Sequence, residues 1–140
     1  MKEKYIKAFM KTAKVFAECS TATKLKVGCI AVKDDRIISI GLNGTPNGWS
    51  NVCEDDNNIT LPEVIHAESN MLMKLAKTSG GAQGSTVFIT HSPCIECAKL
   101  LYQSGVSQIY YEIPFRNDDG INFLKKAGIE IQRIEVFPHK

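Results

Sequence analysis

Apolar residues recur at helical spacing near the start of the chain. Between residues 4 and 18 they fall at positions 5, 9, 13 and 16, with further apolar residues beside them at 6, 10 and 17. This period gives a helix one apolar stripe, and the aromatic members of such a stripe pack in the core. The pattern therefore predicts an amphipathic helix over residues 4–18.

Two apolar runs, 27–32 and 36–42, lie on either side of Lys33-Asp34-Asp35, which predicts two strands joined by a tight turn in an antiparallel hairpin. Beyond them the patterns alternate, and we expect helices over 63–78, 94–104 and 117–126 and strands over 86–90, 108–111 and 129–134. Such alternation favours parallel pairing with helices covering the sheet. We expect an α/β fold with a five-stranded mixed sheet, in one domain over residues 1–140.

Two short motifs supply metal-binding chemistry. His66-Ala67-Glu68 lies near the start of one expected helix, and Pro93-Cys94-Ile95-Glu96-Cys97 opens another, with Pro93 at its first helical position. One imidazole and two thiolates give zinc three protein ligands, and the open fourth position is typical of catalytic rather than structural zinc. Unpaired N–H groups at the helix start favour the thiolate form of both cysteines.

Glu68 is expected to move protons and not to bind the metal. On a helix its side chain would point roughly 200° away from that of His66, yet near a helix start both can line one cavity. A carboxylate there can take a proton from a zinc-bound water and pass it to a substrate.

Two plainer interpretations of these motifs stay open. A lone Cys-x-x-Cys can be redox-active, or it can be half of a structural zinc site that needs a fourth ligand. Residues able to supply that ligand stand elsewhere in the chain, none at the spacing of a zinc finger: Cys19, Cys29, Cys53, His91 and His139.

Composition narrows the function classes. The formal net charge is only +2 and the lysines are scattered, so we expect no nucleic-acid partner. We find no apolar segment long enough for a signal peptide or a membrane span, and so expect no membrane partner. An odd count of five cysteines suits a reducing compartment, and we expect the protein in the cytoplasm, that of the host if the source is viral.

The order of these motifs resembles the cytidine deaminase superfamily, in which H-x-E and P-C-x-x-C mark the zinc-dependent nucleobase deaminases. The flanking sequence is similar more narrowly to deoxycytidylate (dCMP) deaminases of compact viral or bacterial form. That similarity spans nearly the whole chain and rests on Ser20, Lys24 and the stretches 26–28, 36–48, 66–70, 92–99, 103–106 and 127–129. It implies a three-layer α/β/α sandwich and the hydrolysis of dCMP to dUMP and ammonia by a zinc-activated hydroxide, supplying thymidylate synthesis.

The resemblance also implies roles for individual residues. His66, Cys94 and Cys97 would hold one Zn²⁺ per chain, and Glu68 would shuttle protons. The substrate would contact Asn43, at its sugar, and Ser92, whose backbone would accept from the exocyclic amine; the other implied or expected substrate contacts are Thr45, Lys24, Lys26, Phe115 and Arg116. Lys24, Lys26 and Arg116 are the basic residues that we expect at the phosphate. Phe115 stands where family members often carry an aromatic hydroxyl.

Further expectations concern assembly and regulation. The family is often hexameric, activated by dCTP and inhibited by dTTP, and Mg²⁺ can accompany such an effector; short members can lack this regulation. Effector contacts would involve Asn47, Asn70 and Lys77. Alternative functions are deamination of dCTP, of a nucleoside or of an RNA base, and a non-catalytic, zinc-stabilised binding module.

Overall fold

The computed structural model describes residues 1–136, in which four helices and five strands form. Every helix and strand predicted from the sequence is present. In chain order the elements are α1 (Glu3–Ala17), β1 (Gly28–Lys33), β2 (Arg36–Leu42), α2 (Ala67–Ala76), β3 (Thr86–His91), α3 (Ile95–Gln103), β4 (Gln108–Ile113), α4 (Asp119–Lys126) and β5 (Glu130–Arg133).

The strands form one mixed sheet in the order β2-β1-β3-β4-β5. β1 pairs antiparallel with β2, as the predicted hairpin requires, and also antiparallel with β3. β3, β4 and β5 are parallel to one another and are connected through α3 and α4. The five-stranded mixed sheet expected from the sequence is thus confirmed.

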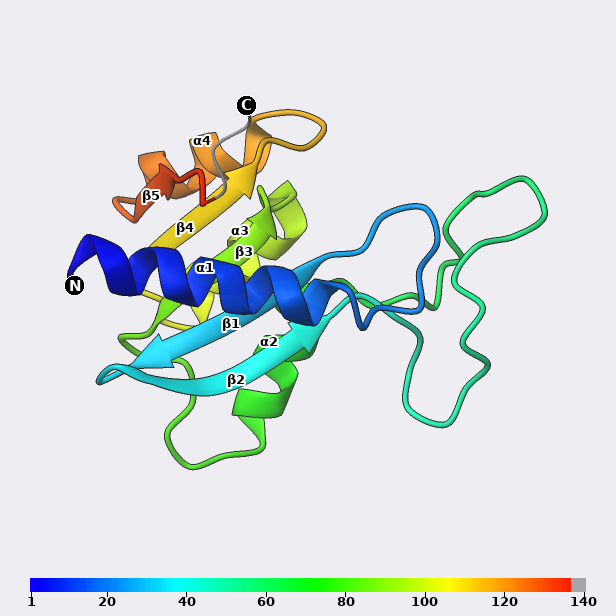
Figure 1. The fold of residues 1–140 in the computed structure, drawn as a ribbon, viewed down its shortest axis with the longest axis horizontal. Helices are drawn as coiled ribbons and strands as arrows, with labels where there is room; N and C mark the ends of the chain where they lie inside the picture. Colours follow the sequence, from blue (N-terminus) through cyan, green and yellow to red (C-terminus); the bar gives the residue numbers. More distant parts are fainter. Residues whose placement is uncertain (137–140) are drawn as a thin grey trace.

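Helices cover both faces of this sheet (Figure 1). Because side chains alternate between the faces of a strand, Ile30 and Val32 of β1 pack in a core with α1, whereas Cys29 and Ala31 pack in a second core. The second core also contains apolar residues of α2, α3 and α4. These two cores make a three-layer α/β/α sandwich, as the family resemblance implied.

Two helix starts differ from the sequence prediction. The helix expected from residue 63 begins at Ala67, because Ile65 pairs in a β-bridge with Gly44 and His66 keeps an extended backbone (φ −66°, ψ 153°). Pro93 is not the first helical residue, so that prediction is wrong. Cys94 is the N-cap of α3, with its sulfur accepting a hydrogen bond from the Cys97 backbone N–H, and Pro93 therefore lies before the cap.

The starts of α2 and α3 meet beside the end of β3, where open α/β sheets commonly bind ligands. The long segment between β2 and α2 runs out beyond the sheet at the end where β2 finishes (Figure 1). Within residues 1–136, no helix is long and apolar enough to cross a membrane.

Close backbone packing of β2 against α2 predicts that Gly41→Ala destabilises the fold. An added Cβ would lie 2.1 Å from the Ala67 carbonyl oxygen and 2.6 Å from the Met71 nitrogen. We expect a loss of about 1–3 kcal/mol in the free energy of unfolding, measured by urea titration. Gly80→Ala is the control, because a Cβ there has nothing within 4 Å. Equal stability of the two variants would contradict this account of the packing.

Candidate metal centre and cavity

Three side chains from the starts of α2 and α3 converge on one point. His66 and Cys94 are the N-cap residues of these helices, and Cys97 lies in the first turn of α3. The Nδ1 atom of His66 lies 3.3 Å from the Cys97 sulfur and 3.6 Å from the Cys94 sulfur. Tetrahedral zinc with ordinary bond lengths would separate such atoms by about 3.5 Å. The donor set and its spacing therefore fit zinc.

The protonation of the two cysteines suits metal binding. Hydrogen bonding to Cys97, and then to His66, lowers the pKa of the Cys94 thiol to about 3, so Cys94 is a thiolate at neutral pH. The same pairing with Cys94 raises the pKa of Cys97, which keeps its proton. Thiolate is the form of sulfur that ligates metals, and binding of a metal to such a pair releases the remaining proton.

Glu68 lies beside this group without belonging to it. It stands in the first turn of α2, is 5% exposed, and lines the same cavity as His66 and Cys94. Burial raises the pKa of its carboxyl to about 7. Near neutral pH such a group can both accept and donate a proton, which is what general acid–base chemistry requires.

The cavity in front of these residues is lined by several of the side chains that the sequence singled out. Its walls come from the segment before β1, the loop between β2 and α2, and the ends of β3 and β4. The lining residues are Ala22, Lys24, Leu25, Val27, Asn43, Cys53, Glu54, Thr60, Val64, His66, Ala67, Glu68, His91, Ser92, Cys94, Phe115 and Arg116.

Asn43 joins two walls of this cavity. Its Oδ1 accepts a hydrogen bond from the Val27 N–H (2.9 Å), and its Nδ2 donates to the Leu25 carbonyl (2.7 Å). The amide therefore ties the end of β2 to the segment that leads into β1. Contact of Asn43 with a sugar stays a prediction.

Ser92, Phe115 and Arg116 form another part of the lining. The Ser92 hydroxyl oxygen accepts from the Phe115 N–H at 2.8 Å, which fixes the loop after β4 against the end of β3. The Arg116 guanidinium lies over the Phe115 ring, with 5.1 Å between its Cζ and the ring centroid. Arg116 also adopts a left-handed backbone (φ 59°), a conformation that non-glycine residues adopt mostly at turns and functional sites.

Five other residues singled out from the sequence do not line this cavity: Lys26, Thr45, Asn47, Asn70 and Lys77. The Thr45 hydroxyl donates to the Ser50 carbonyl, and the Asn70 amide donates to the Leu42 carbonyl. Lys77 is the exposed C-cap of α2, and Lys26 and Asn47 are exposed as well. Any substrate or effector contact by these five stays a prediction.

The fourth-ligand interpretation gains no support from the described part of the chain. Within residues 1–136, the one cluster of three or more ligating side chains is His66, Cys94 and Cys97, and Cys19, Cys29, Cys53 and His91 do not join it. His139 lies outside the described residues.

Glu54 and His91 are polar residues of the lining to which the sequence gave no role in substrate binding. Glu54 accepts hydrogen bonds from the Thr23 and Lys24 N–H groups, both at 3.1 Å, and so holds the loop that carries Lys24. These hydrogen bonds and the charge of Lys24 lower the pKa of the Glu54 carboxyl. His91 entered the sequence argument only as a possible metal ligand. Neither Glu54 nor His91 belongs to a sequence motif whose spacing would have identified it as a residue of the cavity.

Comparison with known proteins agrees with this geometry. Residues 3–113 match the family described as the cytidine and deoxycytidylate deaminase zinc-binding region. The chain belongs to this family. The matched region contains His66, Glu68, Cys94 and Cys97, and therefore the whole candidate metal centre.

Individual relatives fit the same assignment. One similar structure is the crystal structure of dCMP deaminase from the cyanophage S-TIM5 in complex with dCMP and dUMP, with a TM-score of 0.93 and 44% sequence identity. The match covers 96% of this chain and 99% of the cyanophage chain. Deoxycytidylate deaminase of Saccharomyces cerevisiae is 33% identical over 89% of this chain, and ComE operon protein 2 of Bacillus subtilis 30% over 91%. The chain spans only 43% of the yeast protein and 70% of the Bacillus one.

The three-ligand arrangement predicts that Cys94→Ala removes bound zinc, because one imidazole and one remaining thiol cannot hold the ion tightly. The measurement is zinc content by mass spectrometry after dialysis. Cys19→Ala is the matched control, because Cys19 is an exposed, free cysteine outside the cluster, and it should keep one zinc per chain. Full zinc occupancy in Cys94→Ala would disprove this ligand set.

Proposed function

We propose that this family member hydrolyses dCMP to dUMP and ammonia. The proposal rests on one observation, which is that two groups of residues line the same cavity. The first group is His66, Cys94 and Glu68, and the second is the basic pair Lys24 and Arg116. The first group suits hydrolytic deamination, and the second suits a phosphate. Similarity to the cyanophage S-TIM5 enzyme crystallised with dCMP and dUMP supports the same substrate.

His66, Cys94 and Cys97 would hold zinc, which when bound supplies a Lewis acid that makes a water molecule acidic enough to react near neutral pH. Glu68 accepts a proton from the attacking water and delivers it to the ring nitrogen of the base. It then takes the second proton of that water, from the hydroxyl now bonded to the base, and passes it to the departing amine, so that water and dCMP yield dUMP and ammonia. Burial gives Glu68 a pKa of about 7, which allows both the acceptance and the return of the proton.

Substrate binding is assigned to the remaining cavity residues. We place the phosphate at Lys24 and Arg116, and the exocyclic amine at the backbone carbonyl of Ser92. Phe115 contributes an apolar ring without a hydroxyl to the same lining. Asn43 is within the lining, so the sugar contact implied by the family resemblance fits its place.

Residues 1–140 are proposed to act as one catalytic domain in the cytoplasm. A hexamer, activation by dCTP, inhibition by dTTP and an accompanying Mg²⁺ stay predictions of the family resemblance. The competing substrates are dCTP, a free nucleoside and an RNA base, and the competing class is a zinc-stabilised binding module without catalysis.

Ammonia release distinguishes these functions. Zinc-loaded protein should release ammonia faster from dCMP than from dCTP, deoxycytidine or CMP, and Glu68→Gln should lower kcat for dCMP by about 10²–10⁴-fold while keeping its zinc. Faster turnover of dCTP or deoxycytidine would overturn the substrate. No release from any cytosine nucleotide by the zinc-loaded wild type would overturn the proposed function and leave an RNA base or the binding module as the alternatives.

The cavity lining predicts different effects for two basic residues. Arg116→Ala should raise KM for dCMP by about 10–100-fold and leave KM for deoxycytidine nearly unchanged, because only dCMP offers a phosphate to the guanidinium. Lys26 was also expected at the phosphate but does not line the cavity, so Lys26→Ala should raise KM for dCMP much less than Arg116→Ala. A comparable rise would place Lys26 at the phosphate as well. Equal changes for both substrates in Arg116→Ala would remove this residue from the phosphate site.

A further inference from the structure

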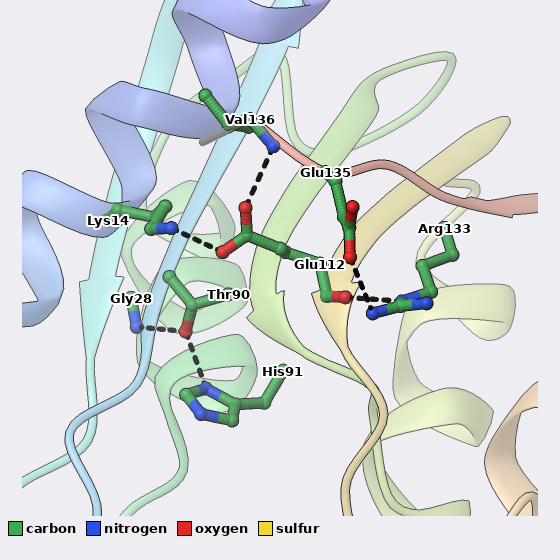
Figure 2. Close-up of polar contacts among 8 residues, drawn as sticks. All are labelled: Lys14, Gly28, Thr90, His91, Glu112, Arg133, Glu135 and Val136. Carbon is green, nitrogen blue, oxygen red and sulfur yellow. Dashed lines mark hydrogen bonds and ion pairs between the residues drawn. The ribbon is translucent and has the colours of Figure 1, made fainter. Parts of the chain in front are cut away.

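A chain of hydrogen bonds leads across the sheet to His91 in the cavity (Figure 2). The Gly28 N–H donates to the Thr90 hydroxyl oxygen at 3.1 Å, and the Thr90 oxygen lies 2.8 Å from Nδ1 of His91. Both side chains are buried, Thr90 with 3% and His91 with 9% of its surface exposed. Thr90 and His91 are the last two residues of β3, so their backbone is fixed by the sheet.

This chain of hydrogen bonds favours one of the two ring nitrogens of His91 as the site of the proton. Within residues 1–136 the Thr90 hydroxyl has Nδ1 of His91 as its hydrogen-bond acceptor and no other. The Thr90 oxygen already accepts from the Gly28 N–H, so its own proton is paired only if the hydroxyl donates to Nδ1, and this arrangement favours a neutral ring with its proton on Nε2. Burial, chiefly, lowers the pKa of His91, which agrees with a neutral ring.

The Nε2 atom of His91 is accessible, and His91 lines the cavity. Among the described residues, the fully buried side-chain nitrogen and oxygen atoms all have hydrogen-bond partners. Nε2 of His91 has no hydrogen-bond partner in this part of the chain, so this atom is not fully buried. Because His91 lines the cavity, we take the cavity as the space to which Nε2 is open. A donor without a protein partner inside a binding cavity is available to a ligand.

Phe115 connects this donor to the basic part of the lining. The His91 ring meets the Phe115 ring edge-on, with 6.0 Å between centroids, and Arg116 lies over the same Phe115 ring. The wall that carries the Arg116 charge therefore also carries the His91 donor. Phe115 itself has no polar atom in its side chain, so His91 supplies hydrogen bonding that this aromatic residue does not.

Behind His91 the sheet is held by a charged network. Glu112 of β4, 3% exposed, pairs with Lys14 of α1 and accepts from the Val136 N–H at 2.9 Å. Arg133 donates to the Glu112 carbonyl and pairs with Glu135 (Figure 2). Burial has the largest influence on the pKa of His91 and lowers it, while Glu112 raises this pKa and Lys14 lowers it.

We propose that His91 donates its Nε2–H to a phosphate oxygen of the bound nucleotide, and that Thr90 is a positioning residue that fixes this tautomer. The proposal rests on the proposed function, because it assigns a further specificity residue to that substrate. A donor fixed at the end of β3 adds one further directional hydrogen bond to those that the exposed cations Lys24 and Arg116 can give a phosphate.

The first test compares His91→Phe with His91→Gln. Phenylalanine keeps the ring contact with Phe115 but has no N–H, whereas glutamine places an amide donor near the position of Nε2. We expect KM for dCMP to rise about tenfold or more in His91→Phe, KM for deoxycytidine to change less than twofold, and His91→Gln to recover most of the loss. Zinc content and thermal midpoint of each variant confirm that it is folded and loaded.

The outcomes separate this proposal from the proposed function. Turnover of dCMP by wild type, with equal KM changes for dCMP and deoxycytidine in His91→Phe, would overturn the phosphate contact and leave the deaminase assignment intact; such a pattern would place the donor at the sugar or base. Absence of turnover in the wild type would overturn the deaminase assignment, and the assigned substrate contact with it.

The second test concerns Thr90. Thr90→Val removes the hydroxyl at nearly constant volume, and Thr90→Ser keeps it. Nitrogen-15 NMR of the His91 ring should show Nε2 protonated and Nδ1 bare in the wild type and in Thr90→Ser, and a mixture of tautomers in Thr90→Val. KM for dCMP should rise only in Thr90→Val. A wild-type ring protonated on Nδ1 would refute the proposed donor.

Discussion

The metal centre depends on backbone contacts so close that only glycine fits at them. Gly41 of β2 lies where a Cβ would meet the Ala67 carbonyl oxygen at 2.1 Å, and Gly120 of α4 where a Cβ would meet the Pro93 carbonyl oxygen at 2.1 Å. The first contact sets the start of α2 and the second sets the turn into α3. Because protein interiors pack densely and shift little, these two contacts hold His66 and Cys94 at ligand distance.

Once the helix starts are fixed, their chemistry follows. A helix start presents N–H groups that favour negative charge, and the Cys97 N–H donates to the Cys94 sulfur there. Glu68 lies in the same region but is buried, and burial raises its pKa, whereas hydrogen bonding lowers that of Cys94. The pKa values of Cys94 and Glu68 are thereby shifted in opposite directions. The low pKa suits Cys94 to ligate a metal, and the raised pKa suits Glu68 to carry protons.

Much of this could be predicted from the sequence because its causes are local. Strand and helix periods predicted every element, and the H-x-E and C-x-x-C motifs predicted the metal cluster. The remainder depends on contacts between distant residues. His66 stays out of α2 because Ile65 pairs with Gly44, and Lys24 is held at the cavity by Glu54, thirty positions away in sequence. No local pattern distinguishes Lys24 from Lys26, so proximity to a motif could not show which of them lines the cavity.

His91 shows how sheet register reaches into the cavity. β1 and β3 run antiparallel with Cys29 opposite Ile89, and continuing that register places Gly28 opposite Thr90, which explains the hydrogen bond between them. Gly28 is itself required by α1, since a Cβ there would lie 2.2 Å from the Ala13 carbonyl oxygen. The packing of α1 thus requires glycine at position 28. The strand register then places this glycine opposite Thr90, and the Thr90 hydroxyl contacts the His91 imidazole in the cavity. A shift of register by one residue would turn His91 to the other face of the sheet and leave the cavity without this donor.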